Sequence, residues 1–176
     1  MTFTIELENG YALRPFAPTD AASLALNADD PDIAVRLRDG FPSPYRQEDA
    51  QWFIENVSSG DPVTVFAIAN ESGEAVGSIG LMVGQNIHDR SAELGYWLGR
   101  SHWGRGTVTA AVRAITRYGL ERLDLLRIHA EPLLPHPASE RVLEKAGFTR
   151  ESVKRKSAVK NGVVRDQSVW VVLADD

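Results

Sequence analysis

The sequence predicts an α+β fold in which about four helices flank a mostly antiparallel central sheet of about seven strands. The first observation is that the spacing of the apolar residues changes along the chain. Helical spacing in the first third of the sequence gives way to β-branched apolar runs. The second is a series of three such runs joined by short turns, typical of an antiparallel meander. The third is a closing pair of strands joined by Asn161–Gly162, a common hairpin turn.

Local patterns then define each element in order. Strands are predicted at residues 11–16, 63–69, 75–83, 91–98, 126–130, 148–156 and 163–173. Helices are predicted to begin near Asp20 and to cover 31–38, 47–57, 106–122 and 137–146. The fourth helix carries one apolar stripe, which consists of Val108, Ala111, Val112, Ile115 and Gly119. The fifth begins with a proline and stops at Gly147.

The composition predicts one globular domain covering residues 1–176. Apolar residues make up 43% of the 176 and charged residues 24%, with a formal net charge of −5, unlike a basic nucleic-acid-binding domain. No apolar run approaches the ~18 residues of a membrane span, and the N-terminus lacks a signal-peptide pattern. We therefore expect a cytoplasmic protein with no nucleic-acid and no membrane partner.

The sequence contains no cysteine, which excludes disulfide bonds, thiolate metal sites and a cysteine nucleophile. No metal site is predicted. The basic cluster near the C-terminus is expected to be the solvated rim of the last hairpin and consists of Lys154, Arg155, Lys156 and Lys160.

Residues 103–109 read WGRGTVT and lead directly into a predicted helix. A helix start leaves N–H groups unpaired and carries partial positive charge, while glycines admit a phosphate and an arginine adds a countercharge. A plain turn is an equal alternative on spacing alone. A P-loop is excluded because GxxxxGK[ST] is absent, and a dinucleotide site is disfavoured because the third glycine and the preceding βαβ strand are lacking.

Longer segments carry a family resemblance. The run AELGYWLGRSHWGRGTVTAAV at 92–112, followed by HPASERVLEKAGF at 136–148, resembles the GNAT superfamily of acyl-CoA-dependent N-acetyltransferases. Within it, the chain is most similar to the branch that acetylates protein N-termini, the ribosomal-protein alanine and serine N-acetyltransferases. The opening LRPFAPTDAASL at 13–24 also resembles that branch. The resemblance implies a GNAT-like sheet and direct attack of a primary amine on acetyl-CoA, without an acyl-enzyme or a metal.

The resemblance also implies which residues bind acetyl-CoA. Pyrophosphate-binding positions of the loop are Trp103, Gly104, Arg105, Gly106, Val108 and Thr109. Backbone groups around Trp97 and Leu98 are expected to hold the thioester carbonyl where two strands separate, and His136 and Ser139 to contact the pantetheine arm.

Two positions depart from the family pattern within the loop and helix. Val108 stands where glycine or alanine is usual, and Ala110 where the branch often has glutamate. Because Val108 lies on the apolar stripe, we expect its side chain to face the core and to leave its amide free.

Two catalytic residues are implied. Glu93 matches the family's base, acting through water, and burial in a strand would raise its pKa; the alternative is a structural carboxylate bound to a neighbouring strand or basic side chain. The family's usual tyrosine acid is replaced by Leu143, so Ser139 is the candidate that hydrogen-bonds the sulfur, unless it merely satisfies a backbone N–H. His136 would then be the N-cap.

The acceptor is left open by the sequence. A protein N-terminal α-amine is the first hypothesis, a small amine or antibiotic the second, and a catalytically impaired acyl-CoA-binding module the third. A homodimer is a further open alternative. Acceptor specificity is expected in the first two helices and the hairpin around Asn161.

Overall fold

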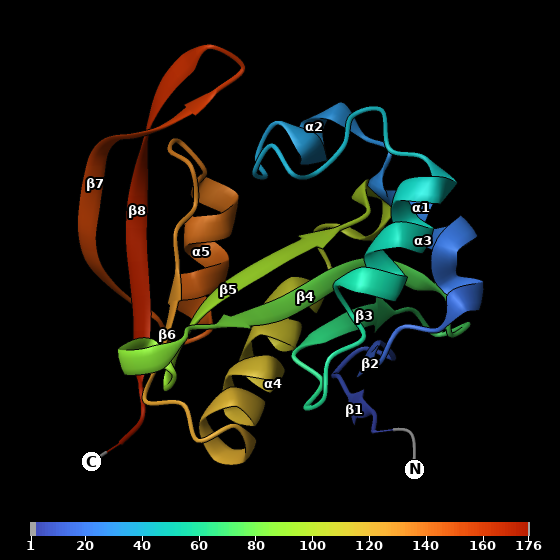
Figure 1. Cartoon of the computed structure of the whole chain (residues 1–176), viewed down its shortest axis with the longest axis horizontal. Helices are drawn as coiled ribbons and strands as arrows, with labels where there is room; N and C mark the ends of the chain where they lie inside the picture. The colour runs from blue at the N-terminus through green and yellow to red at the C-terminus, as the bar shows by residue number, and fades with distance from the viewer. Residues whose placement is uncertain (1–2, 176) are drawn as a thin grey trace.

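One mixed sheet with helices on both faces forms the protein, as the computed structural model shows for residues 3–175 (Figure 1). Its eight strands are β1 Ile5–Glu6, β2 Ala12–Arg14, β3 Val65–Ala69, β4 Ala75–Val83, β5 Ser91–Leu98, β6 Arg127–Ala130, β7 Thr149–Lys160 and β8 Val163–Leu173. The helices are α1 Ala21–Ala28, α2 Pro31–Ala34, α3 Gln47–Asn56, α4 Thr107–Arg122 and α5 Pro137–Lys145. Residues 1, 2 and 176 of the predicted domain lie outside the described part.

The strand order is β1-β2-β3-β4-β5-β6-β8-β7, and every neighbouring pair is antiparallel except β5 and β6. The predicted α+β class and the antiparallel meander are therefore confirmed. None of the helices within residues 3–175 is long and apolar enough to cross a membrane.

Three elements differ from the prediction. Strand β1 was not predicted, because two residues are too few to show a period, and it forms only by pairing Ile5 with Leu13 across a turn. Strand β7 extends to the hairpin turn rather than ending at residue 156. Helix α2 ends at Ala34, and the chain continues in turns in which Leu37 N donates to Ala34 O.

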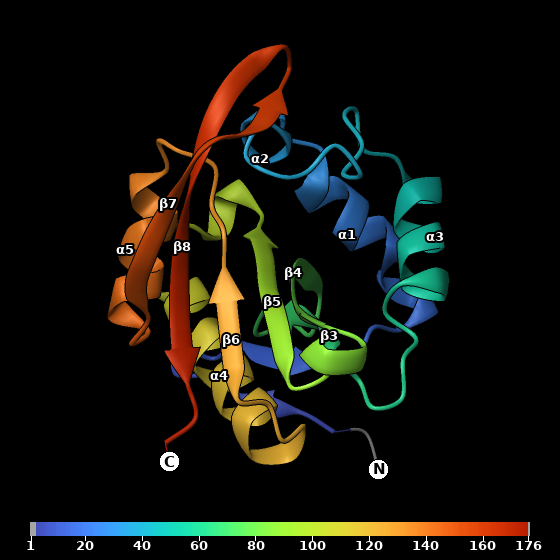
Figure 2. The ribbon, with the colours of Figure 1, turned by 60° about the vertical axis from the view of Figure 1, so that its left-hand side comes forward.

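Alternation along the central strands produces two cores. Phe66 and Ile68 of β3 belong to the main core beneath α4 and α5, whereas Ala67 belongs to a second core beneath α1 and α3. The helices accordingly lie in two layers, on either side of the sheet (Figure 2). Most of the predicted stripe of α4 is buried in the main core, as expected from helical spacing.

The parallel pair at the sheet centre is short. It comprises Ser91 with Arg127, Ala92 with Ile128, and Glu93 with His129. Beyond Glu93, β5 remains paired with β4, whereas β6 pairs only with β8. The sheet consequently opens into a wedge between β5 and β6, and this wedge positions the candidate site (Figure 2).

Candidate active site

A cleft of about 690 Å³ extends from the wedge between β5 and β6 towards α3 and the β7–β8 hairpin. Four of the predicted site residues line it: Glu93, Trp97, His136 and Ser139. Leu98 and the loop residues Trp103, Gly104, Arg105, Gly106, Val108 and Thr109 are not part of this lining within the described chain. The loop instead precedes α4, at the far end of β5.

The glycines of the loop are required for their backbone conformation rather than for space. Gly104 and Gly106 both have φ of 76°, in the left-handed region, and a Cβ added to either would meet no atom within 4 Å. The first hydrogen bond of α4 runs from Ala110 N to Gly106 O at 3.0 Å, so the preceding amides at 107–109 are those that a helix start leaves unpaired. The side chain of Val108 packs against the main core, as predicted, and leaves the solvent side of this turn open.

Side chains that the sequence did not single out hold the loop in place. Asn9, in the β1–β2 turn, donates from Nδ2 to Arg105 O at 3.1 Å and to Thr107 Oγ1 at 3.2 Å. Trp103 Nε1 donates to Leu98 O at 2.6 Å, which ties the loop to the end of β5. Both Trp103 and Leu98 therefore have a structural contact of their own, whatever they offer to a ligand. The Asn9–Gly10 turn was the only local sign of this support.

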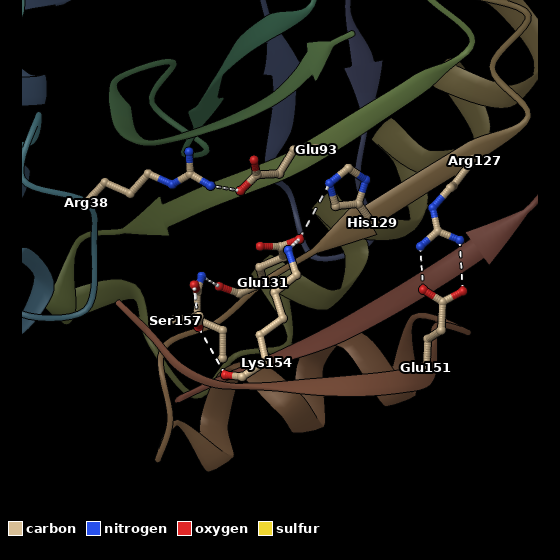
Figure 3. A network of polar contacts seen from close by, with 9 residues as sticks. Arg38, Glu93, Arg127, His129, Glu131, Glu151, Lys154 and Ser157 are labelled. Atoms are coloured by element: carbon tan, nitrogen blue, oxygen red, sulfur yellow. Dashed lines mark hydrogen bonds and ion pairs between the residues drawn. The ribbon is translucent and has the colours of Figure 1, made fainter. Parts of the chain in front are cut away.

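Glu93 is bound to a basic side chain, as the second of its two predicted roles, that of a structural carboxylate, anticipates. Its carboxylate accepts a hydrogen bond from Arg38 Nη2 within an ion pair, and its side chain is 22% exposed (Figure 3). Arg38 comes from the chain after α2 and is itself 68% exposed. The pair is therefore open to solvent on the arginine side, and an incoming ammonium group could compete for the same carboxylate.

His129 stands beside Glu93 on the neighbouring strand. Burial lowers its pKa, although the negative charges of Glu93 and Glu131 act in the opposite direction. Its Nδ1 atom is buried and has no hydrogen-bond partner among the described residues. Glu131 is held by Lys154 Nζ at 2.6 Å (Figure 3). Two anchored carboxylates, Glu93 and Glu131, thus line the cleft, and the His129 imidazole lies behind them with Nε2 3.9 Å from Glu131 Oε1.

Ser139 faces Tyr96 of β5, which the sequence did not single out as a site residue. The Tyr96 hydroxyl and Ser139 Oγ are 2.7 Å apart, joining β5 to the first turn of α5 across the wedge. Burial raises the pKa of Tyr96 to about 12, although the hydrogen bond with Ser139 lowers it. The neighbouring Leu143 is fully buried in the main core and offers no polar group to the cleft.

His136 is the N-cap of α5, as predicted. Its Nδ1 accepts from Ser139 N at 3.4 Å and from Arg36 Nη1 at 3.2 Å, so the imidazole carries its proton on Nε2. Burial, together with Arg36, lowers the pKa of His136 to about 4. Because His136 takes the capping role, the Ser139 hydroxyl is not used for it.

The outer part of the cleft is apolar and is bounded by the hairpin. Trp52, Val57 and Met82 line it with exposed side chains. Lys160 of β7 donates to Asp39 Oδ1 at 2.9 Å and is 8% exposed. The prediction that Lys160 belongs to a solvated rim is therefore wrong, because the fold buries its stem against a loop 121 residues away. Within residues 3–175, no group of three His, Asp or Glu side chains could hold a metal ion.

Comparison with known proteins identifies the family of this chain. A family model described as Acetyltransferase (GNAT) domain matches residues 11–149. The Probable N-acetyltransferase YjcK of Bacillus subtilis (strain 168) is 29% identical over 170 residues, or 93% of this chain and 94% of that protein. The Putative ribosomal N-acetyltransferase YdaF of the same organism is 28% identical over 188 residues, covering 97% and 95%.

Among solved structures, RimL, described as a ribosomal L7/L12 alpha-N-protein acetyltransferase in complex with coenzyme A, has the same fold. Its TM-score is 0.86 at 19% identity, covering 98% of this chain and 99% of that one. The chain belongs to the GNAT family of acetyl-CoA-dependent N-acetyltransferases. The family expected from the two sequence segments is thereby confirmed.

Proposed function

We propose that the protein transfers the acetyl group of acetyl-CoA to the α-amine of a protein N-terminus. The observation that carries the proposal is the wedge between β5 and β6, which opens at Glu93 into a large cleft and is crossed by Tyr96 and Ser139. A carboxylate at one end and a hydroxyl donor further along are the two groups that amine deprotonation and thiolate departure require.

The loop before α4 fits the pyrophosphate of coenzyme A. Its glycines hold a left-handed conformation with open space on the ligand side, and the amides at 107–109 are available at a helix start. Arg105 is exposed and supplies a countercharge. Backbone groups of Trp97 and Leu98 would hold the thioester, with Trp103 bracing the loop. When bound, acetyl-CoA supplies the activated acetyl group.

Glu93 acts as the base, through water, on the ammonium group of the acceptor. Its carboxylate is paired with Arg38 until an acceptor ammonium takes the place of the guanidinium. The Ser139 hydroxyl donates a hydrogen bond to the departing sulfur. Because Val108 faces the core, its departure from the family pattern is compatible with binding and does not favour an impaired module.

A protein N-terminus suits the outer cleft. The apolar side chains of Trp52, Val57 and Met82 can receive the first residues of a polypeptide, while Glu93 and Glu131 provide negative charge for its terminal ammonium. YdaF, which is similar in sequence, and RimL, which has the same fold, both carry ribosomal acetyltransferase names and support the same acceptor class.

The test is coenzyme A release with a matched panel of acceptors. Peptides with a free N-terminus, the same peptides with a blocked N-terminus and an internal lysine, polyamines and aminoglycosides are compared, and products are located by mass spectrometry. We expect acetylation of the free-terminus peptides only. Turnover restricted to small amines would contradict the N-terminal acceptor, and acetyl-CoA binding without turnover on any amine would contradict the transferase activity.

A further inference from the structure

The polar pair formed by Tyr96 and Ser139 lies across the wedge between β5 and β6. Tyr96 is three residues beyond Glu93, the last residue of β5 that pairs with β6. Ser139 is in the first turn of α5, and the two hydroxyl oxygens are 2.7 Å apart. Both residues line the cleft, as Glu93 does, so the pair borders the same space as the candidate base.

One of the two hydroxyl protons of the pair is not used in the hydrogen bond between them. Two hydroxyl groups carry two protons, and their mutual hydrogen bond uses one of them. The phenol is the stronger acid of the two, so it donates to Ser139 Oγ, which leaves the serine proton free to point elsewhere. No backbone group competes for Ser139 Oγ among the described residues, because His136 caps the helix instead. The serine proton is therefore available to a ligand in the cleft that Ser139 lines.

We propose that Tyr96 is a positioning residue, whose hydroxyl orients and strengthens the Ser139 hydroxyl as a hydrogen-bond donor to the sulfur of coenzyme A. The inference rests on the proposed function, which places Ser139 at that sulfur. Tyr96 thus provides a phenol from the opposite side of the wedge, whereas the position of the family's usual tyrosine is occupied by Leu143.

The reaction balances without an acyl-enzyme. The N–C bond forms as the C–S bond breaks, and the electron pair of that bond remains on sulfur, where Ser139 O–H stabilises it. The proton lost by the amine leaves through Glu93 to water, and the thiolate takes up a proton from water. Tyr96 stays protonated throughout, which its raised pKa of about 12 allows.

The experiment measures the thiol pKa of bound coenzyme A, which needs no acceptor. The thiolate absorbance of the coenzyme A complex is titrated with pH for the native protein, Tyr96→Phe, Ser139→Ala and the double variant. Tyr118→Phe is the matched control, since it removes a hydroxyl that binds Val63 O at 2.9 Å, outside the cleft lining.

We expect Ser139→Ala to weaken thiolate stabilisation by about 10- to 100-fold, and Tyr96→Phe by about 3- to 10-fold, as for loss of a charged and of a neutral hydrogen bond. The double variant should be no worse than Ser139→Ala, because Tyr96 acts through the serine. Turnover should fall in parallel, with an unchanged KM for acetyl-CoA.

A thiol pKa in Tyr96→Phe equal to that of the native protein would overturn the inference, as would additive losses in the double variant. If the native protein acetylates no amine, the proposed function fails, yet the thiol titration still decides whether the pair acts on sulfur. If acetylation is vigorous and Tyr96→Phe is indistinguishable from native, only the positioning role fails. Ser139→Thr, which keeps a hydroxyl, should retain most of the thiolate stabilisation.

Discussion

Single side chains in this enzyme owe their chemistry to partners that are distant in the sequence. Glu93 could be placed on a strand from its neighbours, but its ion pair with Arg38 joins residues 55 positions apart. The proposed function places the acceptor amine at this carboxylate. Two predictions belong to this scale.

The first concerns the base. Glu93→Gln keeps the size of the side chain but removes the acceptor of the amine proton, so turnover should fall by about 100-fold, within the range of lost general-base catalysis. Acetyl-CoA affinity, measured by calorimetric titration, should change less than about twofold, because loop amides would hold that ligand.

Arg38→Gln is the companion variant. It frees the Glu93 carboxylate, so the acceptor KM should fall while turnover is retained. Native turnover in Glu93→Gln across the pH range would remove this carboxylate from the mechanism.

The second concerns pH and stability. The pKa of His136 is about 4 in the folded chain, below the ~6.5 of an unfolded histidine, so the unfolded state binds more protons between these values. The stability that neutral His136 contributes is present above about pH 6.5 and is lost as the pH falls towards 4.

His136→Asn keeps a capping side chain but does not titrate. The free energy of unfolding in urea, measured at pH 7 and pH 4.5, should fall less between these pH values in this variant than in the native protein. The reason is that the variant takes up fewer protons on unfolding, by at most one per chain. An identical pH dependence in the two proteins would show that His136 does not titrate as described.

At the scale of elements, local patterns account for most helices and strands. The stripe of α4 was predicted from its spacing, and its members Ala111, Val112 and Ile115 are fully buried. Strand β1 was missed because its two residues become a strand only through pairing with β2. Length decides the difference, since a sixteen-residue helix repeats its pattern several times.

Gly119 tests how closely α4 packs on the sheet. A Cβ added there would lie 2.8 Å from Cδ1 of both Ile128 and Leu81. Gly119→Val should therefore lower the free energy of unfolding by about 1–3 kcal/mol through overpacking, measured by urea denaturation. Arg117→Val, on the exposed face of the same helix, is the control for valine's helix propensity and should cost about 0.5 kcal/mol or less. Equal effects in the two variants would contradict close packing at Gly119.

At the scale of the whole molecule, the cleft is closed off by segments from opposite ends of the chain. Lys160 of the final hairpin reaches Asp39 in the loop after α2, and both residues line the cleft. The hairpin and the early helices were the regions expected to decide the acceptor, and this contact joins them physically.

Lys160→Met tests the contact, because it retains an apolar stem and removes the charge. We expect the KM for a peptide acceptor to rise by up to about fivefold, as an ion pair with an exposed partner contributes about 1 kcal/mol at most. Kinetics with a small amine should not change.

Asp39→Asn should be the more destabilising of the two variants, because it leaves the buried Lys160 charge without its partner. A peptide KM unaffected by either substitution would exclude this bridge from acceptor binding.

The sequence by itself determined the fold class, the order of the central meander, the glycine loop at the start of α4 and the family. These features depend on local periodicity and on contiguous segments, which a single chain displays directly. The tertiary structure alone decided the parting of β5 from β6, the pairing of Tyr96 with Ser139, the ion pair of Glu93 and the burial of Lys160. Each of these joins residues far apart in the chain, and their proximity arises only when the strands take their order in the sheet.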